Sequence, residues 1–246
     1  MGTAIVLTSG KGGTGKTTCS GAIASALASL GHPTVCVDCD IGLRNLDLAL
    51  GVTDFALWDF SDVIDGHAKL SDATISHPDI QNLYFLAAPA GLSPEDINPH
   101  GMKELVDKLK SEYEYCIIDC PAGLGAGFKL SCIGADMAII VSTGDAASLR
   151  DCQRTVAALS AQGIENVRLL VNRLSPRMLR QTRATVDDVI DVVGAQLLGL
   201  VSEDESVALA ANFEKPLLVF GAKYAYDQFF RIARRITGER VPLGKA

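Results

Sequence analysis

Residues 10–17 carry the groups in this chain that point most directly to a reaction. They read Gly-Lys-Gly-Gly-Thr-Gly-Lys-Thr, which fits the pattern G-x-x-x-x-G-K-[ST] of loops that hold phosphates. Glycines let successive backbone N–H groups turn inward around an anion, and the N-terminus of a following helix adds partial positive charge. The pattern assigns Lys16 to the β- and γ-phosphates of a nucleotide and the Thr17 hydroxyl to Mg²⁺.

Three aspartates follow apolar runs that have the length of strands. Asp38 and Asp40 come after residues 34–37, and Asp119 comes after residues 116–118. Carboxylates beside a phosphate site do not bind the phosphate, because like charges repel; they hold Mg²⁺ through water or orient the attacking water. A hydrophobic strand that ends in aspartate is typical of the Walker B motif, which assigns Asp119 to the waters of Mg²⁺.

The elements that position these residues follow a strand–helix rhythm. The apolar runs are continuous rather than alternating, which indicates a parallel sheet covered on both faces, built from right-handed βαβ units. We therefore predict one domain over residues 1–246, an α/β fold whose mostly parallel, twisted sheet is covered by helices on both faces. Ligands of such sheets lie at the carboxyl ends of the strands, so the phosphate loop, the aspartates and Asn172 should gather at one edge. Strands are expected at 4–7, 34–37, 83–87, 116–118, 138–141, 167–171 and 197–201, and helices at 17–30, 99–111, 146–162, 185–193, 203–211 and 223–237.

The composition is that of a folded protein without a membrane span. The chain has 246 residues, of which 48% are hydrophobic and 21% charged, and its formal net charge is −7. The longest apolar runs, such as 137–141, fall far short of the roughly 20 residues that a spanning helix needs. The N-terminus has neither the basic nor the long apolar region of a secretory signal. The seven cysteines, an odd number, are expected to be reduced and buried.

Several stretches resemble the MinD/ParA family of ATPases, whose phosphate loop is a deviant Walker A motif. Two of them, G-L-R-N-L-D at 42–47 and D-x-x-x-V-I-x-G at 59–66, are closer to the MinD branch than to the family in general. One departure is Ser202, which stands where the family's G-x-[VI]-P-E-D motif has proline. The other matching motifs are K-G-G-x-G-K-[ST] at 11–17, D-x-P-A-G at 119–123, S-x-R-D at 148–151 and V-N-R at 171–173.

The resemblance implies a P-loop NTPase fold of the SIMIBI type and assigns roles to individual residues. In this family the first lysine of the loop, here Lys11, crosses to the nucleotide of a second subunit, so a homodimer is expected when ATP is bound. The expected catalytic residues are Lys11, Lys16 and Asp40, with Asp40 orienting water. Contacts to ATP are expected from Gly12, Gly13, Thr14, Gly15, Lys16, Thr17, Thr18, Gly123, Asn172, Arg173 and Asp204, with Asn172 reading adenine. Mg²⁺ is expected at Thr17, Asp38 and Asp119.

The function that the resemblance implies is an ATP-dependent, dimerising switch of the MinD type, which hydrolyses ATP to ADP and phosphate and regulates where the division site is placed. A protein activator or effector would bind its dimer face. The alternatives are a ParA-type partition ATPase, a flagellar-placement ATPase and an iron–sulfur carrier of the same superfamily. The net charge argues against nucleic acid, for which the candidate basic cluster is Arg231, Arg234, Arg235 and Arg240. Cys36 and Cys39 form a C-x-x-C, but no second pair accompanies it.

The C-terminal helix expected at 223–237 is amphipathic, with aromatic residues on one face and arginines nearby. A helix of this kind can lie in a membrane surface, but packing on its own sheet is the commoner use, and in the family this segment is the last core helix. Residues 238–246 are too few and too polar for a second, interfacial helix. We expect a cytoplasmic protein, with a peripheral place at the inner face of the cell membrane left open.

Overall fold

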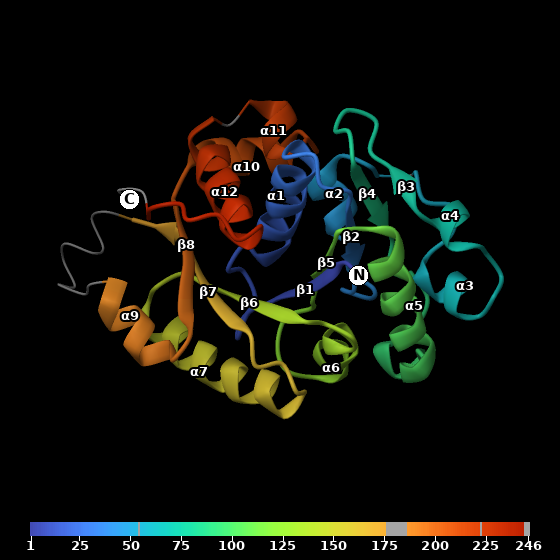
Figure 1. Cartoon of the computed structure of the whole chain (residues 1–246), viewed down its shortest axis with the longest axis horizontal. Helices are drawn as coiled ribbons and strands as arrows, with labels where there is room; N and C mark the ends of the chain where they lie inside the picture. Colours follow the sequence, from blue (N-terminus) through green and yellow to red (C-terminus); the bar gives the residue numbers. More distant parts are fainter. Residues whose placement is uncertain (54, 176–185, 222, 244–246) are drawn as a thin grey trace.

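A sheet of eight strands runs through the computed structural model, which describes residues 1–53, 55–175, 186–221 and 223–243 (Figure 1). The strand order is β3-β4-β2-β5-β1-β6-β7-β8, and every neighbouring pair is parallel except β3 with β4. The α/β fold with a mostly parallel sheet is therefore confirmed. The strands are β1 (Thr3–Thr8), β2 (Thr34–Asp38), β3 (Ile75–Ser76), β4 (Leu83–Leu86), β5 (Tyr115–Asp119), β6 (Met137–Ser142), β7 (Val167–Leu174) and β8 (Gln196–Ser202).

Helices cover both faces of the sheet, and each face has its own buried apolar core. The upper face in Figure 1 carries α1 (Lys16–Ser29), α2 (Leu46–Leu50), α10 (Glu205–Asn212), α11 (Leu217–Phe220) and α12 (Lys223–Ile236). The lower face carries α5 (Pro99–Glu112), α6 (Ala126–Cys132), α7 (Ala146–Ala161) and α9 (Val186–Val193). The short helices α3 (Phe60–Ile64) and α4 (Leu70–Ala73) add Phe60 and Leu70 to the lower core, and a 3-10 turn spans Pro94–Asp96.

Helix α1 is buried along most of its length because it packs on the sheet and has α12 beside it on the same face (Figure 1). Its sequence, KTTCSGAIASALAS, is rich in small residues, which let neighbouring backbones approach closely. At Gly21 a side-chain Cβ would lie 3.3 Å from Leu50 Cδ2 of α2. This packing fixes the helix that follows the phosphate loop against the sheet.

The expected elements are found with shifted ends, and several short ones were not predicted. Helix α5 begins as expected, with Asn98 as N-cap accepting from the His100 N–H at 3.0 Å. Strand β7 was expected to end at 171 but continues to Leu174, because Leu174 pairs with Ser202 of β8 beyond an irregularity in which Arg173 takes a φ of 53°. Residue 185 of the helix expected at 185–193 lies outside the described residues. The elements that were not predicted include β3, α6 and α11, which have seven residues or fewer and carry no clear hydrophobic period.

The sheet order brings the chemistry-bearing loops together. Strand β5 lies between β2 and β1, with Asp119 paired in register with Asp38 on one side and with Leu7 on the other. The phosphate loop leaves the end of β1 immediately after Thr8. The expectation that these residues gather at one edge of the sheet is confirmed.

Candidate nucleotide-binding site

The loop between β1 and α1 forms the wall of a cavity of about 350 Å³. Gly13 and Gly15 take positive φ values of 78° and 84°, which glycine adopts without strain. Among the described residues, the cavity is lined by Ser9, Gly12, Gly13, Thr14, Gly15, Lys16, Thr17, Thr18, Asp40, Leu43, Asn45, Ala122 and Arg173. The expected site residues outside this lining are Lys11, Asp38, Asp119, Gly123, Asn172 and Asp204.

The Asp119 carboxylate lies behind the loop and accepts three hydrogen bonds from side chains at the start of α1. Its Oδ1 accepts from Lys16 Nζ at 3.2 Å and from Ser20 Oγ at 2.7 Å, and its Oδ2 accepts from Thr17 Oγ1 at 2.7 Å. Asp119 is 1% exposed and Lys16 is 7% exposed, so the pair is shielded from water. The structure therefore joins the lysine and threonine of the phosphate loop to the aspartate that ends β5.

The two aspartates after β2 have different surroundings. Asp38 is buried, and its carboxylate accepts from the backbone N–H groups of Asp40 at 2.8 Å and Leu46 at 3.3 Å. Burial, followed by the nearby Asp119 carboxylate, raises the pKa of Asp38 to about 7. Asp40 is partly exposed and lines the cavity. Burial raises the pKa of Asp40, with Lys16 opposing the shift and Asp119 adding to it. Asp38 thus holds the loop that presents Asp40.

Asn172 connects β7 to the phosphate loop. Its Nδ2 donates to the backbone carbonyl of Thr14 at 2.8 Å, and a Cβ on Gly15 would lie only 2.5 Å from the same nitrogen. One amide proton of Asn172 is therefore engaged by the loop itself. The adjacent Arg173 is exposed and lines the cavity. The role of Asn172 in reading adenine stays a prediction.

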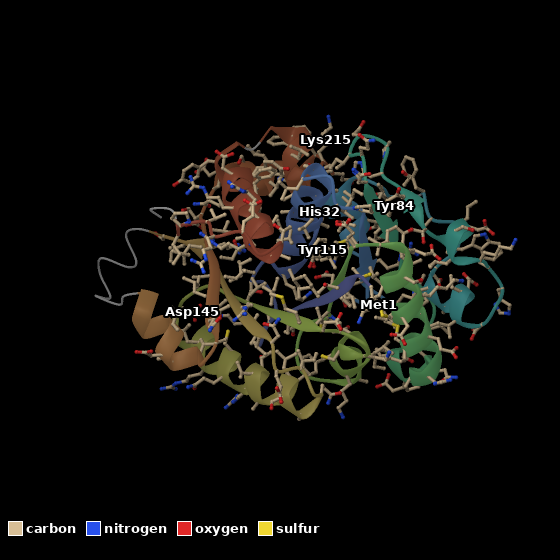
Figure 2. The ribbon with its side chains drawn as sticks, viewed as in Figure 1. Met1, His32, Tyr84, Tyr115, Asp145 and Lys215 are labelled. Carbon is tan, nitrogen blue, oxygen red and sulfur yellow. The ribbon has the colours of Figure 1, made fainter. Side chains whose placement is uncertain are left out.

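Lys11 is paired within its own chain. Its Nζ lies 3.2 Å from Asp145 Oδ1 and 3.1 Å from Oδ2, and Asp145 (labelled in Figure 2) is the N-cap of α7. Burial alone would raise the pKa of Asp145, but hydrogen bonds from Thr143, the Ser148 N–H and Lys11 outweigh it and lower the pKa to about 2. Asp145 is a functional candidate that our sequence reasoning missed, although an aspartate three residues before a serine at a helix start is a recognisable cap signal.

Helix α7 also packs directly against the beginning of the loop. A Cβ on Gly10 would lie 2.4 Å from Asp151 Cβ, so only glycine fits there. Ser148, in the S-x-R-D stretch, is buried and its Oγ lies 3.1 Å from Ser142 Oγ. The stretch therefore holds the start of α7 against the ends of β1 and β6.

The loop after β8 is organised by side chains of its own helices. Asp204 caps α10, accepting from the Ser206 N–H at 2.9 Å, and also accepts from the Ala225 N–H at 3.2 Å. Ser202, the residue that replaces the family's proline, donates its N–H to Gln228 Oε1 at 2.8 Å and accepts from Gln228 Nε2 at 3.0 Å. The hydrogen bond that proline could not make is thus used to fix this loop to α12.

The residues of the cavity fit a nucleotide phosphate and a magnesium ion. Within the described residues, the buried Thr14 Oγ1 in the phosphate loop has no hydrogen-bond partner. This hydroxyl is therefore free to donate to a bound anion. The donor set next to it consists of backbone N–H groups and Lys16, and the oxygen ligands Thr17 and Asp119 are of the kind that Mg²⁺ prefers. Lys16 is paired with Asp119 at 3.2 Å and also opposes the rise that burial causes in the pKa of Asp40, so two carboxylates face its ammonium group.

The cysteines lie on both sides of the sheet. All seven are free and buried, as expected. Cys36 belongs to the core that contains α1, whereas Cys39 belongs to the core on the opposite face, so the C-x-x-C pair does not converge. In the described part of the chain, no group of three or more His, Cys, Asp or Glu side chains is arranged to hold a metal ion. No helix there has the length and apolar character needed to cross a membrane.

The sequence of this chain is similar to the sequences of known proteins. Residues 5–217 match the CobQ/CobB/MinD/ParA nucleotide binding domain family, CbiA. The septum site-determining protein MinD of Bacillus subtilis is 39% identical over 99% of this chain and 92% of its own length. Its counterpart from Synechocystis is 38% identical over 98% of this chain and 92% of its own length.

Two solved structures are similar over nearly the whole chain. The MinC:MinD cell division protein complex of Aquifex aeolicus contains a chain that is 32% identical, with a TM-score of 0.91 and coverage of 99% of both chains. The Pyrococcus horikoshii septum site-determining protein MinD, complexed with Mg-ADP, is 28% identical, with a TM-score of 0.84 and coverage of 96% of both chains. With its phosphate loop, its strand-end aspartates and these likenesses, the chain belongs to the MinD/ParA family of P-loop nucleotide-binding proteins, in which its similarity to MinD proteins extends over nearly its full length.

Proposed function

We propose that this chain is a Mg²⁺-dependent ATPase switch of the MinD type, which takes part in placing the cell division site. The proposal rests mainly on one observation: Lys16 and Thr17 both donate hydrogen bonds to the Asp119 carboxylate behind the 350 Å³ cavity. It supports the proposal because these are the side chains with which phosphate-loop proteins hold the nucleotide phosphates and Mg²⁺. Names of relatives at 38–39% identity supply the biological role.

The phosphate loop does the binding. Its backbone N–H groups, arranged by Gly13 and Gly15, surround the phosphates, and the start of α1 adds its partial charge. Lys16 exchanges Asp119 for the β- and γ-phosphates. Thr17 and Asp119 would hold Mg²⁺, which when bound neutralises charge on the phosphates.

Asp40 is suited to orient the attacking water. It lines the cavity and is partly exposed, so water reaches it, and Asp38 fixes the loop on which it sits. The raised pKa of Asp40 makes it a better proton acceptor than an ordinary surface carboxylate. Transfer of the terminal phosphoryl group to that water yields ADP and phosphate.

The active form is a homodimer in which Lys11 of each subunit leaves Asp145 and reaches the nucleotide of the other. The pair is roughly one-third exposed, so water can replace each partner. A protein effector binds the dimer, as the relative from Aquifex aeolicus forms a complex named MinC:MinD. Because ATP is made available in the cytoplasm and the seven cysteines are free, we place the activity there.

The test compares the mass of the protein in solution with ADP and with a non-hydrolysable ATP analogue, both with Mg²⁺, by size-exclusion chromatography with light scattering. We expect a monomer with ADP and a dimer with the analogue. Lys11→Ala should bind nucleotide but stay monomeric, whereas Asp40→Ala should dimerise and lose ATPase activity. Lys69→Ala, an exposed lysine far along the chain, is the control. A wild-type protein that neither binds nor hydrolyses ATP would overturn the proposal.

A further inference from the structure

Ser20 makes a buried hydrogen bond to the carboxylate of Asp119, which also pairs with Lys16. It lies on α1 with no exposed surface, and its Oγ is 2.7 Å from Asp119 Oδ1 and 3.1 Å from the Lys16 carbonyl oxygen. A serine hydroxyl has one proton to donate. We assign it to Asp119, because that contact is shorter and its acceptor is charged.

The donors to Asp119 divide into two kinds. Thr17 and Ser20 are short side chains three residues apart on one helix face, and they hold Oδ2 and Oδ1 respectively. Together they fix the rotation of the carboxylate. Lys16 is long and flexible, and it shares Oδ1 with Ser20. Only the Lys16 contact must break for the ammonium group to reach a phosphate.

We propose that Ser20 is a positioning residue that keeps Asp119 Oδ1 hydrogen-bonded when Lys16 is transferred from Asp119 to a phosphate. Without the hydroxyl, the departure of Lys16 leaves a buried carboxylate oxygen without a donor, which is a costly arrangement. Ser20 therefore lowers the cost of nucleotide binding without touching the nucleotide. The inference rests on the proposed function, because it requires Lys16 to bind a nucleotide phosphate.

Ser25 supplies a matched control on the same helix. It is equally buried, at 1% exposure, but its Oγ donates only to the Gly21 carbonyl oxygen, at 2.7 Å. Ser25→Ala and Ser20→Ala thus remove the same atom from the same kind of environment. The two variants differ in whether the lost hydroxyl donated a hydrogen bond to Asp119.

The experiment measures the affinity of the full chain for ADP by isothermal titration calorimetry in EDTA, together with urea unfolding without nucleotide. We expect Ser20→Ala to raise the dissociation constant about tenfold, which corresponds to about 1.4 kcal/mol. Ser25→Ala should change it less than twofold, and both variants should unfold at similar urea concentrations. Using EDTA separates the effect on Lys16 from any effect on Mg²⁺.

The outcomes distinguish this inference from the proposed function. If the wild-type protein binds ADP and Ser20→Ala binds it equally well, or if Ser25→Ala loses as much affinity, the role of Ser20 is overturned while the proposed function stands. If the wild-type protein binds no nucleotide, both are overturned. A loss of affinity confined to Ser20→Ala supports the inference, because a merely structural role would affect both variants alike.

Discussion

Lys11 Nζ lies 3.1 Å from Asp145 Oδ2 of the same chain, so the first lysine of the phosphate loop is held at the start of α7. The side chains are 37% and 34% exposed, and a pair so open to water contributes about 0–1 kcal/mol. The pKa of Asp145 is lowered to about 2, so its carboxylate stays charged throughout the neutral range. A contact of this size would be readily exchanged for a triphosphate, as the proposed dimer requires.

Removing the charge of Asp145 should make dimerisation easier. Asparagine caps a helix about as well as aspartate, so Asp145→Asn keeps the bond from the Ser148 N–H but loses the ion pair. We expect the ATP-analogue concentration at half-maximal dimerisation to fall by up to about fivefold, the equivalent of about 1 kcal/mol. Analytical ultracentrifugation across an analogue titration measures it.

The control for this variant is Asp107→Asn, which breaks the exposed pair of Lys103 with Asp107 on α5 and should leave the midpoint unchanged. Weaker dimerisation of Asp145→Asn would show that the carboxylate supports the dimer rather than retaining Lys11 in the monomer.

Two glycines of the phosphate loop should differ sharply in their tolerance of a methyl group. A Cβ at Gly10 would lie 2.4 Å from Asp151 Cβ and 2.7 Å from its carbonyl carbon, so α7 would have to shift. A Cβ at Gly12 meets nothing nearer than Ala122 Cβ at 3.9 Å. We expect Gly10→Ala to lower the free energy of unfolding by about 1–3 kcal/mol and Gly12→Ala by less than about 0.5 kcal/mol. Urea unfolding without nucleotide measures both, and equal losses would contradict the packing argument.

The separate motifs of the site could be predicted from the sequence, but the contacts between them are seen only in the structure. The loop at 10–17 and the aspartates at 38, 40 and 119 could be identified because each is a local motif that follows an apolar strand. Parallel strands share one carboxyl edge, which is why their gathering could be expected too. That β5 lies between β1 and β2 could not be read from the sequence, because strand order depends on packing between distant segments.

Contacts between distant residues were the main omission. The bond from Asn172 Nδ2 to the Thr14 carbonyl spans 158 positions, and the bond from Ser20 to Asp119 spans 99. The sequence around each residue does not identify its partner, because serine in a helix and asparagine near a strand end are both common. The end of β7 was misjudged for a related reason. Polar Asn172 and Arg173 suggested the end of the strand, but they form an irregularity in the ladder, after which Leu174 pairs with Ser202 of β8.

The serine at position 202 should be coupled to Gln228. Gln228→Ala removes both hydrogen bonds of the pair and leaves the Ser202 N–H without a protein partner, so we expect a loss of about 1–2 kcal/mol in the free energy of unfolding. Ser202→Pro restores the family's motif but deprives Gln228 of its donor, and it should also destabilise this chain.

A double-mutant cycle tests the coupling. If Gln228 and Ser202 act as a pair, Ser202→Pro should cost much less stability when Gln228 is already alanine, with a coupling energy of about 1 kcal/mol. Additive losses would show that the two residues contribute independently. Chemical denaturation of the four proteins under identical conditions supplies the energies.

The buried His77 should make stability depend on pH. Its Nδ1 accepts from the N–H groups of Asp79 at 3.0 Å and Ile80 at 3.1 Å, so the ring is neutral and its Nε2 donates to the Leu50 carbonyl at 2.8 Å. Burial lowers the pKa of His77, with the Leu50 carbonyl and Asp79 opposing the shift. A proton on Nδ1 would face two N–H groups and break both bonds.

The sign of the effect follows from comparing the folded and unfolded chains. Below the usual histidine pKa of about 6.5, the unfolded chain takes up a proton that the folded chain does not, so stability falls as pH decreases through this window. The difference in unfolding free energy between wild type and His77→Gln should therefore shrink between pH 7.5 and pH 5.5. The exposed His100→Gln is the control and should show the wild-type slope. Since glutamine does not titrate, identical slopes for wild type and His77→Gln would mean that His77 takes up a proton as readily in the folded protein as in the unfolded chain, which would contradict the expected effect of its burial.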